Sequence, residues 1–228
     1  MGNTIAIMQP YIFPYIGYFQ LINYVDKFIF YDDVTFIKQG WINRNKITIN
    51  DKEVFFTIPL SNASSYTLIQ DIKINQNLFS KVKKKLYKSI KQSYGKAPFF
   101  NEAYEIIEKT FELNTDSMSE MAKYSVKQVS EYLELNTEFA KSQNAYDNLS
   151  LSGQDRVIDI ATQEKAVHYV NPIGGKELYS SDIFRKNNLD LSFIKVNDSL
   201  DKKLIIDLLM NHSKEQVRSI LNQYTIVK

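Results

Sequence analysis

The residue types best suited to chemistry lie in three short segments of the sequence. Adjacent carboxylates, Asp32 and Asp33, directly follow an apolar run; such groups can accept a proton from an amine. The segment 38–45 combines a lysine, amides, the sole tryptophan and an arginine, whose planar fork suits phosphate or carboxylate. His168 lies in a short apolar segment and could transfer protons. We therefore predict Asp33, Lys38 and His168 as candidate catalytic residues.

Each of these candidates also has a structural interpretation. Two acids after a strand are often solvated or cap a helix, and a histidine within a strand is more often a satisfied structural residue than a catalyst. Hard cations usually take more oxygen ligands than Asp32 and Asp33 supply, so we predict no metal. No nucleotide-binding, zinc-protease or serine-hydrolase motif occurs in the chain, and we predict no cofactor.

A proline-aromatic segment, Gln9–Tyr18, is the most informative stretch of the chain. Its prolines fix the backbone and make it stiff, so its rings either present a preorganised ligand surface or cap the core. The indole of Trp41 could stack on a sugar or a base, and a Gly-Gly pair could approach a phosphate closely. The predicted substrate-binding residues are Gln9, Tyr11, Phe13, Tyr18, Asp32, Trp41, Asn43, Arg44, Asn45, Asn171, Gly174 and Gly175.

Two apolar strands with a helix between them would position these segments. Residues 4–8 and 28–31 are short apolar runs, and 17–25 carries a helical apolar face. This order favours a βαβ unit with parallel strands. Ligands of such units sit beyond the carboxyl ends of the strands, so we expect the loops 9–14 and 32–38 to converge on one crevice.

The rest of the chain supports one α/β domain spanning residues 1–228. Residues 46–49 and 53–58 predict a hairpin that turns at Asn50 and Asp51. Apolar residues at helical spacing predict a helical insertion or subdomain at 75–135. Further strands are expected at 69–74, 138–142, 167–170 and 191–196. Further helices are expected at 152–165, 180–187 and 202–221. Ser152 and Asp155 form a weak capping box at the start of the first of these helices. The predicted fold is Rossmann-like, with a mainly parallel sheet.

Composition narrows the classes of partner. The formal net charge is +2 over 228 residues, too small for a general nucleic-acid binder. The lysines on one face of the segment 81–91 are interpreted as a solvated helix face. There is no cysteine, which is compatible with a cytoplasmic location. No segment predicts a spanning helix or a signal peptide. We expect a small-molecule substrate, with a homodimer contact through the C-terminal helices as an option.

The segments Met8–Ile22, Asp32–Lys38 and Trp41–Asn45 resemble the WbqC-like protein family, and Asn171–Tyr179 fits the same pattern. The resemblance implies bacterial O-antigen, lipopolysaccharide or related surface-polysaccharide biosynthesis, with a glycine transferase or similar aminoacyl transfer as the activity. It assigns no catalytic residue. The start of the chain also looks similar to nucleotidylyltransferase-like domains. Those place histidines in the first loop, and this chain has none before His168, which argues against adenylyl transfer but leaves binding of a sugar nucleotide open.

Three functional hypotheses follow. The first is an acyl or aminoacyl transferase that acts on an amino-sugar nucleotide, in which an acid or His168 accepts the amine proton and Lys38 and Arg44 hold a phosphate or carboxylate. The second is a nucleotide-dependent enzyme that activates an acid. The third is a non-catalytic protein that binds a sugar nucleotide. The sequence does not separate the first from the third.

Overall fold

A parallel sheet forms the centre of the computed structural model, which describes residues 3–61, 63–140, 146–200 and 203–228. Among these residues, six strands pair in the order β10-β9-β8-β1-β2-β7. Their bounds are β1 Asn3–Met8, β2 Lys27–Phe30, β7 Glu138–Phe139, β8 Ala166–Pro172, β9 Asp190–Val196 and β10 Tyr224–Val227. All neighbours are parallel except β10, which runs antiparallel to β9. The mixed α/β class and the mainly parallel sheet are confirmed.

The strand order reverses at β1. From β1 the chain passes through α1 (Ile16–Tyr24) to β2 and β7 on one side, and then returns through α5 (Gly153–Gln163) to β8 on the other side. Met8 lies beside Phe30 in the β1–β2 pair, which confirms the predicted βαβ unit. In open α/β sheets, the point at which the order reverses is where ligands bind, outside the carboxyl ends of the strands.

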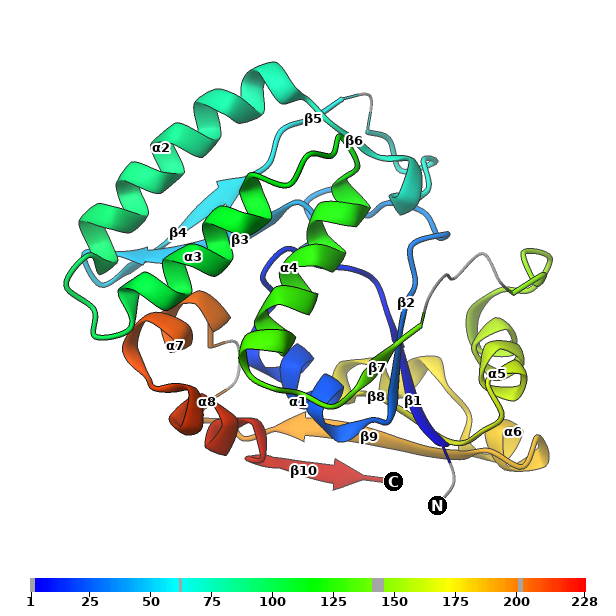
Figure 1. Ribbon diagram of the computed structural model, residues 1–228. Coiled ribbons are helices and arrows are strands. Elements are labelled where there is room, and N and C mark those ends of the chain that lie inside the picture. The colour runs from blue at the N-terminus through cyan, green and yellow to red at the C-terminus, as the bar shows by residue number, and fades with distance from the viewer. Residues whose placement is uncertain (1–2, 62, 141–145, 201–202) are drawn as a thin grey trace.

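Helices cover both faces of the sheet because successive strand residues are apolar on both faces. Ala6 and Phe28 pack with α1 in one cluster of buried residues. Ile5 and Ile29 pack with α5 and α6 (Ser181–Lys186) in the other. Figure 1 shows α1 and α4 on one side of β1 and β2, and α5 and α6 on the other side.

Three helices occupy the range predicted to be helical: α2 (Gln76–Tyr94), α3 (Phe100–Phe111) and α4 (Met118–Tyr132). Asn75 and Ser117 begin α2 and α4 by accepting a hydrogen bond from a backbone N–H of the first turn. The apolar faces of the three helices join the same core cluster as α1. They therefore pack against the α1 side of the sheet.

The predicted hairpin is confirmed as β3 (Arg44–Ile49) and β4 (Lys52–Thr57). Asn50 and Asp51 at its turn have positive φ angles of 49° and 60°, which a tight hairpin turn of this twist requires. The strand predicted at 69–74 is wrong in its first half: a 3-10 turn, η1 (Ile69–Asp71), precedes the short β6 (Lys73–Ile74), which pairs with β5 (Leu60–Ser61).

The described residues 203–228 form two helices, within the range 202–221 that was predicted to be helical, and the strand β10, which was not predicted. The helices are α7 (Ile205–Asn211) and α8 (Lys214–Leu221), and a 3-10 segment, η3 (Ile173–Leu178), follows β8. Part of the strand predicted at 138–142 lies outside the described residues, and β7 covers its first two positions. In the described part of the chain, no helix is both long enough and apolar enough to cross a membrane.

Candidate functional site

The carboxyl ends of β1 and β2 bring together two of the segments singled out in the sequence. The backbone N–H of Tyr31 donates to the carbonyl of Met8 at 2.8 Å, so Gln9, directly after β1, and Asp32, two residues after the end of β2, lie at neighbouring strand ends. The loops 9–14 and 32–38 therefore start side by side, as the βαβ interpretation predicts.

A cavity of about 430 Å³ opens at this edge, and we call it the switch-point cavity because it lies where the strand order reverses. Gln9 and Tyr31 follow β1 and β2, and Tyr179 follows η3. The wall opposite is the first turn of α5. The lining side chains used below are Gln9, Tyr31, Ser152, Gly153, Arg156 and Tyr179.

A buried ion pair lies at one wall of the switch-point cavity, and Arg156 is the partner that lines it. The guanidinium of Arg156 bonds to Oδ2 of Asp33, and the two side chains are only 5% and 4% exposed. Its Nε donates to Oδ1 of Asn148 at 2.9 Å, and the group lies 5.0 Å from the ring centre of Tyr31. Three neighbours thus fix one cation beneath the cavity.

Asp32 and Asp33 diverge, although they are adjacent in sequence. Asp32 is 1% exposed; its Oδ2 accepts a hydrogen bond from Ser119 and lies 2.5 Å from Nζ of Lys123 on α4. Asp32 therefore ties α4 to the end of β2 and does not line the switch-point cavity. Among the described residues, no three His, Cys, Asp or Glu side chains come close enough to hold a metal ion.

The first turn of α5 lines the switch-point cavity with Ser152, Gly153 and Gln154. Ser152 is the N-cap residue, but its side chain makes no cap hydrogen bond, so the predicted capping box with Asp155 does not form. Gly153 follows with a φ of 54° and no atom within 4 Å of the position of a Cβ. Free N–H groups at a helix start carry partial positive charge and bind anions. Together with Arg156, they suit a phosphate group.

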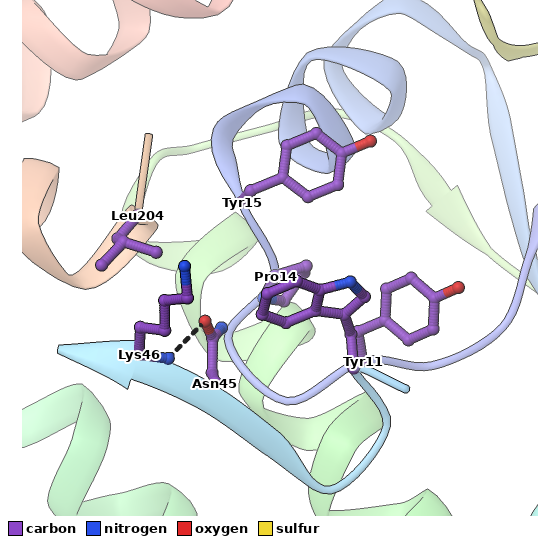
Figure 2. Close-up of a pocket in the computed structure, with 7 residues that line it drawn as sticks. Tyr11, Pro14, Tyr15, Asn45, Lys46 and Leu204 are labelled. Carbon is purple, nitrogen blue, oxygen red and sulfur yellow. Dashed lines mark hydrogen bonds between the residues drawn. The ribbon is translucent and has the colours of Figure 1, made fainter. Parts of the chain in front are cut away.

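A second cavity, which we call the aromatic cavity, has a volume of about 280 Å³. It is lined by Tyr11, Pro14, Tyr15, Trp41, Asn45, Lys46 and Leu204. Figure 2 shows Tyr11 on one side of this space and Lys46 and Leu204 on the other. Three of the predicted substrate-binding residues, Tyr11, Trp41 and Asn45, therefore lie together here and not in the switch-point cavity.

Asn45 holds the loop 9–14, which contributes Gln9 to the switch-point cavity and Tyr11 and Pro14 to the aromatic cavity. Its Nδ2 donates to the carbonyl of Ile12 at 2.9 Å and also to that of Phe13. The N–H of Phe13 donates to Oγ of Ser125 at 3.1 Å. These bonds hold Phe13 at a φ of 46°, a left-handed conformation that costs a bulky residue on the order of 1–2 kcal/mol.

Phe13 and Tyr18 support the loop from beneath. Both side chains have no exposed surface. The hydroxyl of Tyr18 donates to the carbonyl of Gln9 at 2.9 Å, and burial raises the pKa of Tyr18, so its phenol stays protonated. In this conformation neither ring can touch a ligand, and their predicted role in binding becomes one of shaping the loop.

The segment 38–45 divides into buried and exposed residues. Asn43 is 8% exposed, and its Nδ2 donates to the carbonyl of Ile58 at 2.8 Å, which closes the hairpin. Arg44 lies 4.9 Å from the ring centre of Phe55. Lys38 is exposed on a turn and lines neither cavity.

His168 lies away from both cavities. It pairs with Thr4 and Asp190 near the start of β8, whereas Asp33 follows the carboxyl end of β2. It lines a separate cavity with Asp190 and Lys228, and burial lowers its pKa below the usual 6.5. The structure does not bring His168 together with Asp33 or Lys38.

Asn171 and Gly175 position Tyr179 in the wall of the switch-point cavity. Nδ2 of Asn171 donates to the hydroxyl of Tyr169 at 2.6 Å and lies 3.5 Å from that of Tyr179. A Cβ on Gly175 would lie 2.4 Å from Oδ1 of Asn171, so a larger residue there would displace the Asn171 amide. Gly174 is exposed and has no atom within 4 Å of such a Cβ.

Arg156 and the first turn of α5 were not among the site residues predicted from the sequence. Arg156 precedes the apolar residues Val157 and Ile158, and an arginine at the start of an amphipathic helix is ordinary. The available signal was the pair of acids after β2, since a buried carboxylate requires a cation.

Comparison with known proteins identifies the family of the chain. The sequence profile described as the WbqC-like protein family matches residues 9–219. A protein of Mycobacterium tuberculosis, described as uncharacterized, is 24% identical over 226 residues, which cover 93% of this chain and 95% of the relative. No solved structure matches the chain. Since the profile spans both cavities and almost the whole chain, the chain belongs to the WbqC-like protein family.

Proposed function

We propose that this chain binds a nucleotide-linked amino sugar in the switch-point cavity and transfers an acyl or aminoacyl group, such as glycyl, to the amino group of the sugar. The proposed setting is O-antigen or related surface-polysaccharide biosynthesis. The observation that carries the proposal is the place of this cavity at the carboxyl ends of β1 and β2, where the strand order reverses. Dinucleotides and flavin nucleotides bind at this place in other doubly wound sheets.

The electrostatics of the switch-point cavity favour a diphosphate. The start of α5 lines it, and the free N–H groups of a helix start carry partial positive charge. Arg156 has five N–H donors, and its bonds to Asp33 and Asn148 use two of them. The guanidinium therefore keeps donors for an additional oxygen, and its bonds hold it in place before a ligand arrives.

Neutral hydrogen-bonding groups complete the wall. Burial raises the pKa of Tyr31 and of Tyr179, so both phenols stay protonated near neutral pH and can donate to sugar or phosphate oxygens. Gln9 adds an amide between them. This combination of a few polar groups with an anion-binding helix start suits the sugar and the diphosphate of one ligand.

The transfer step forms a bond between the sugar nitrogen and the acyl carbon, and it breaks the bond between that carbon and the leaving group of the donor. A base must take the proton that the nitrogen loses. Asp33 is our candidate, because its Oδ1 has no hydrogen-bond partner among the described residues and it adjoins the cavity wall through Arg156. Lys38 and His168 lie outside this cavity, so we assign them no step.

Ser152→Asp tests the proposal. Aspartate is as good an N-cap residue as serine or asparagine, so the fold should be kept, but its carboxylate would stand where the phosphate binds. Isothermal titration with a UDP-linked amino sugar should show affinity at least about tenfold weaker in Ser152→Asp than in the uncharged control Ser152→Asn. Equal affinities in the two variants would overturn the proposed site.

Turnover decides among the functional hypotheses once binding is found. Mass spectrometry of the sugar nucleotide after incubation with acyl and aminoacyl donors should show the acylated product, and Asp33→Asn should slow its formation. Tight binding without product from any donor would favour the non-catalytic binding protein. Release of pyrophosphate from ATP with an acid would favour the acid-activating enzyme.

A further inference from the structure

We infer that the aromatic cavity is a second binding site, for a pyranose ring that carries a carboxylate or a phosphate. This inference goes beyond the proposed function, because the aromatic cavity is built largely by other elements than the switch-point cavity. It would hold even if no nucleotide bound at the sheet edge. Three features carry it: the aromatic walls, the charge at the rim, and the rigidity of the loops.

The walls of the aromatic cavity suit one sugar ring. Tyr11, Tyr15 and Trp41 provide aromatic rings, and Trp41 keeps 41% of its surface exposed. Aromatic rings give a broad apolar surface with a polar edge, which matches the apolar face and the hydroxyl rim of a pyranose. The volume of about 280 Å³ lies just below the range of ligand pockets, which runs from about 300 to 1,000 Å³. It is therefore too small for a whole sugar nucleotide.

Two cations of β3 lie at or beside the aromatic cavity: Lys46 lines it, and Arg44 precedes Lys46 by two residues on the same strand. Arg44 and Lys46 lie 4.9 and 5.0 Å from the ring centre of Phe55, which in turn lies 6.0 Å from the ring of Trp41. Lys46 is neutralised by Glu53 at 2.5 Å. Arg44 donates to the carbonyl of Gly40 but forms no ion pair with any residue that the structure describes. The planar fork of Arg44 is thus free to bind an anion.

The loops that form the walls are held in place before any ligand binds. Phe13 and Gln39 have positive φ angles of 46° and 61°, and such conformations persist only where the surroundings hold them, often at ligand sites. Asn45 supplies part of that restraint by bonding the loop carbonyls. The wall formed by Leu204 is fixed by its bridge to Tyr15. Little conformational entropy remains to be lost on binding.

Trp41 makes the aromatic cavity directly testable, because it is the sole tryptophan of the chain. Its fluorescence should change saturably on titration with glucuronate or with glucose 1-phosphate. The neutral ring, glucose, should bind roughly tenfold more weakly or worse, since it lacks the charge-assisted bond. A response to only one of the two anions identifies the carboxylate or the phosphate as the group recognised. No response to either, or equal affinity for glucose, would overturn the inference.

Charge variants of the hairpin sharpen the test. Arg44→Gln should weaken binding of the responding anion roughly tenfold. Lys52→Gln removes the same charge from an exposed position of β4 and should leave it unchanged. Glu53→Gln frees Lys46 and should tighten binding. Equal losses in Arg44→Gln and Lys52→Gln, or no gain in Glu53→Gln, would contradict the site.

Binding at the switch-point cavity and binding at the aromatic cavity can be tested independently. Ser152→Asp should leave the Trp41 response intact, whereas Arg44→Gln should leave binding of the UDP-linked sugar in the titration calorimeter intact. Thermal melting of each variant checks that the fold is kept. Loss of the Trp41 response in Ser152→Asp would count against a separate second site.

Discussion

Removing one partner of the buried pair between Asp33 and Arg156 should cost far more stability than removing a surface ion pair. Both side chains are about 95% buried, with 5% of Arg156 and 4% of Asp33 exposed. In Arg156→Met, Asp33 would remain buried without its cation, which typically costs about 3–5 kcal/mol. The same change removes the bond to Asn148 and the contact with Tyr31. We expect a loss of about 4 kcal/mol.

The companion variant separates charge from packing. In the double variant Asp33→Asn with Arg156→Met, no charge is left buried, so we expect roughly half of the loss to be recovered. Urea unfolding followed by circular dichroism gives the free energy of unfolding for the four proteins of this cycle, and similar slopes would show that the fold is kept. A loss below about 1 kcal/mol in Arg156→Met would refute the reasoning, because that is the value of an exposed pair.

Three further changes test the supporting residues. Gly175→Ala places a Cβ within 2.4 Å of Oδ1 of Asn171 and should lower the free energy of unfolding, measured in urea, by about 1–3 kcal/mol. The control Gly174→Ala, whose Cβ would have no atom within 4 Å, should change that free energy by less than about 0.5 kcal/mol. Burial lowers the pKa of His168 in the folded state from the usual 6.5, so the unfolded chain binds the proton more readily. The wild type should therefore lose stability as the pH falls below 6.5, and His168→Gln should lose less over that range. An equal loss of stability below pH 6.5 in the wild type and in His168→Gln would contradict this role of His168. Asn45→Ala leaves two loop carbonyls without a donor and should lower the free energy of unfolding by about 2 kcal/mol, while a change near zero would show that the loop does not depend on it.

The strand and helix pattern near the start of the chain was readable from the sequence. The runs 4–8 and 28–31 are too short for helices, and the helix between them leaves parallel pairing as the simplest arrangement, which the β1–β2 register confirms. The hairpin turn at Asn50 and Asp51 followed from residues that tolerate a positive φ. These features depend on local patterns, and local patterns are what a sequence displays.

The composition of the cavity walls was not readable in the same way. Arg156 lies more than a hundred residues from Asp33 in the chain, and only the crossover from β7 to β8 brings α5 to the end of β2. His168 was correctly placed in a strand, but its place in the amino-terminal half of β8 depends on the pairing with β1 and β9. The edge strand β10 has only four residues, so its alternating pattern was too short to recognise.

A crystal structure of the chain with a UDP-linked amino sugar tests the central claim most directly. We expect the diphosphate in the switch-point cavity, with its oxygens about 2.7–3.2 Å from the N–H groups at the start of α5 or from the guanidinium of Arg156. A diphosphate bound anywhere else, including in the aromatic cavity, would contradict the assignment of the switch-point cavity as the nucleotide site.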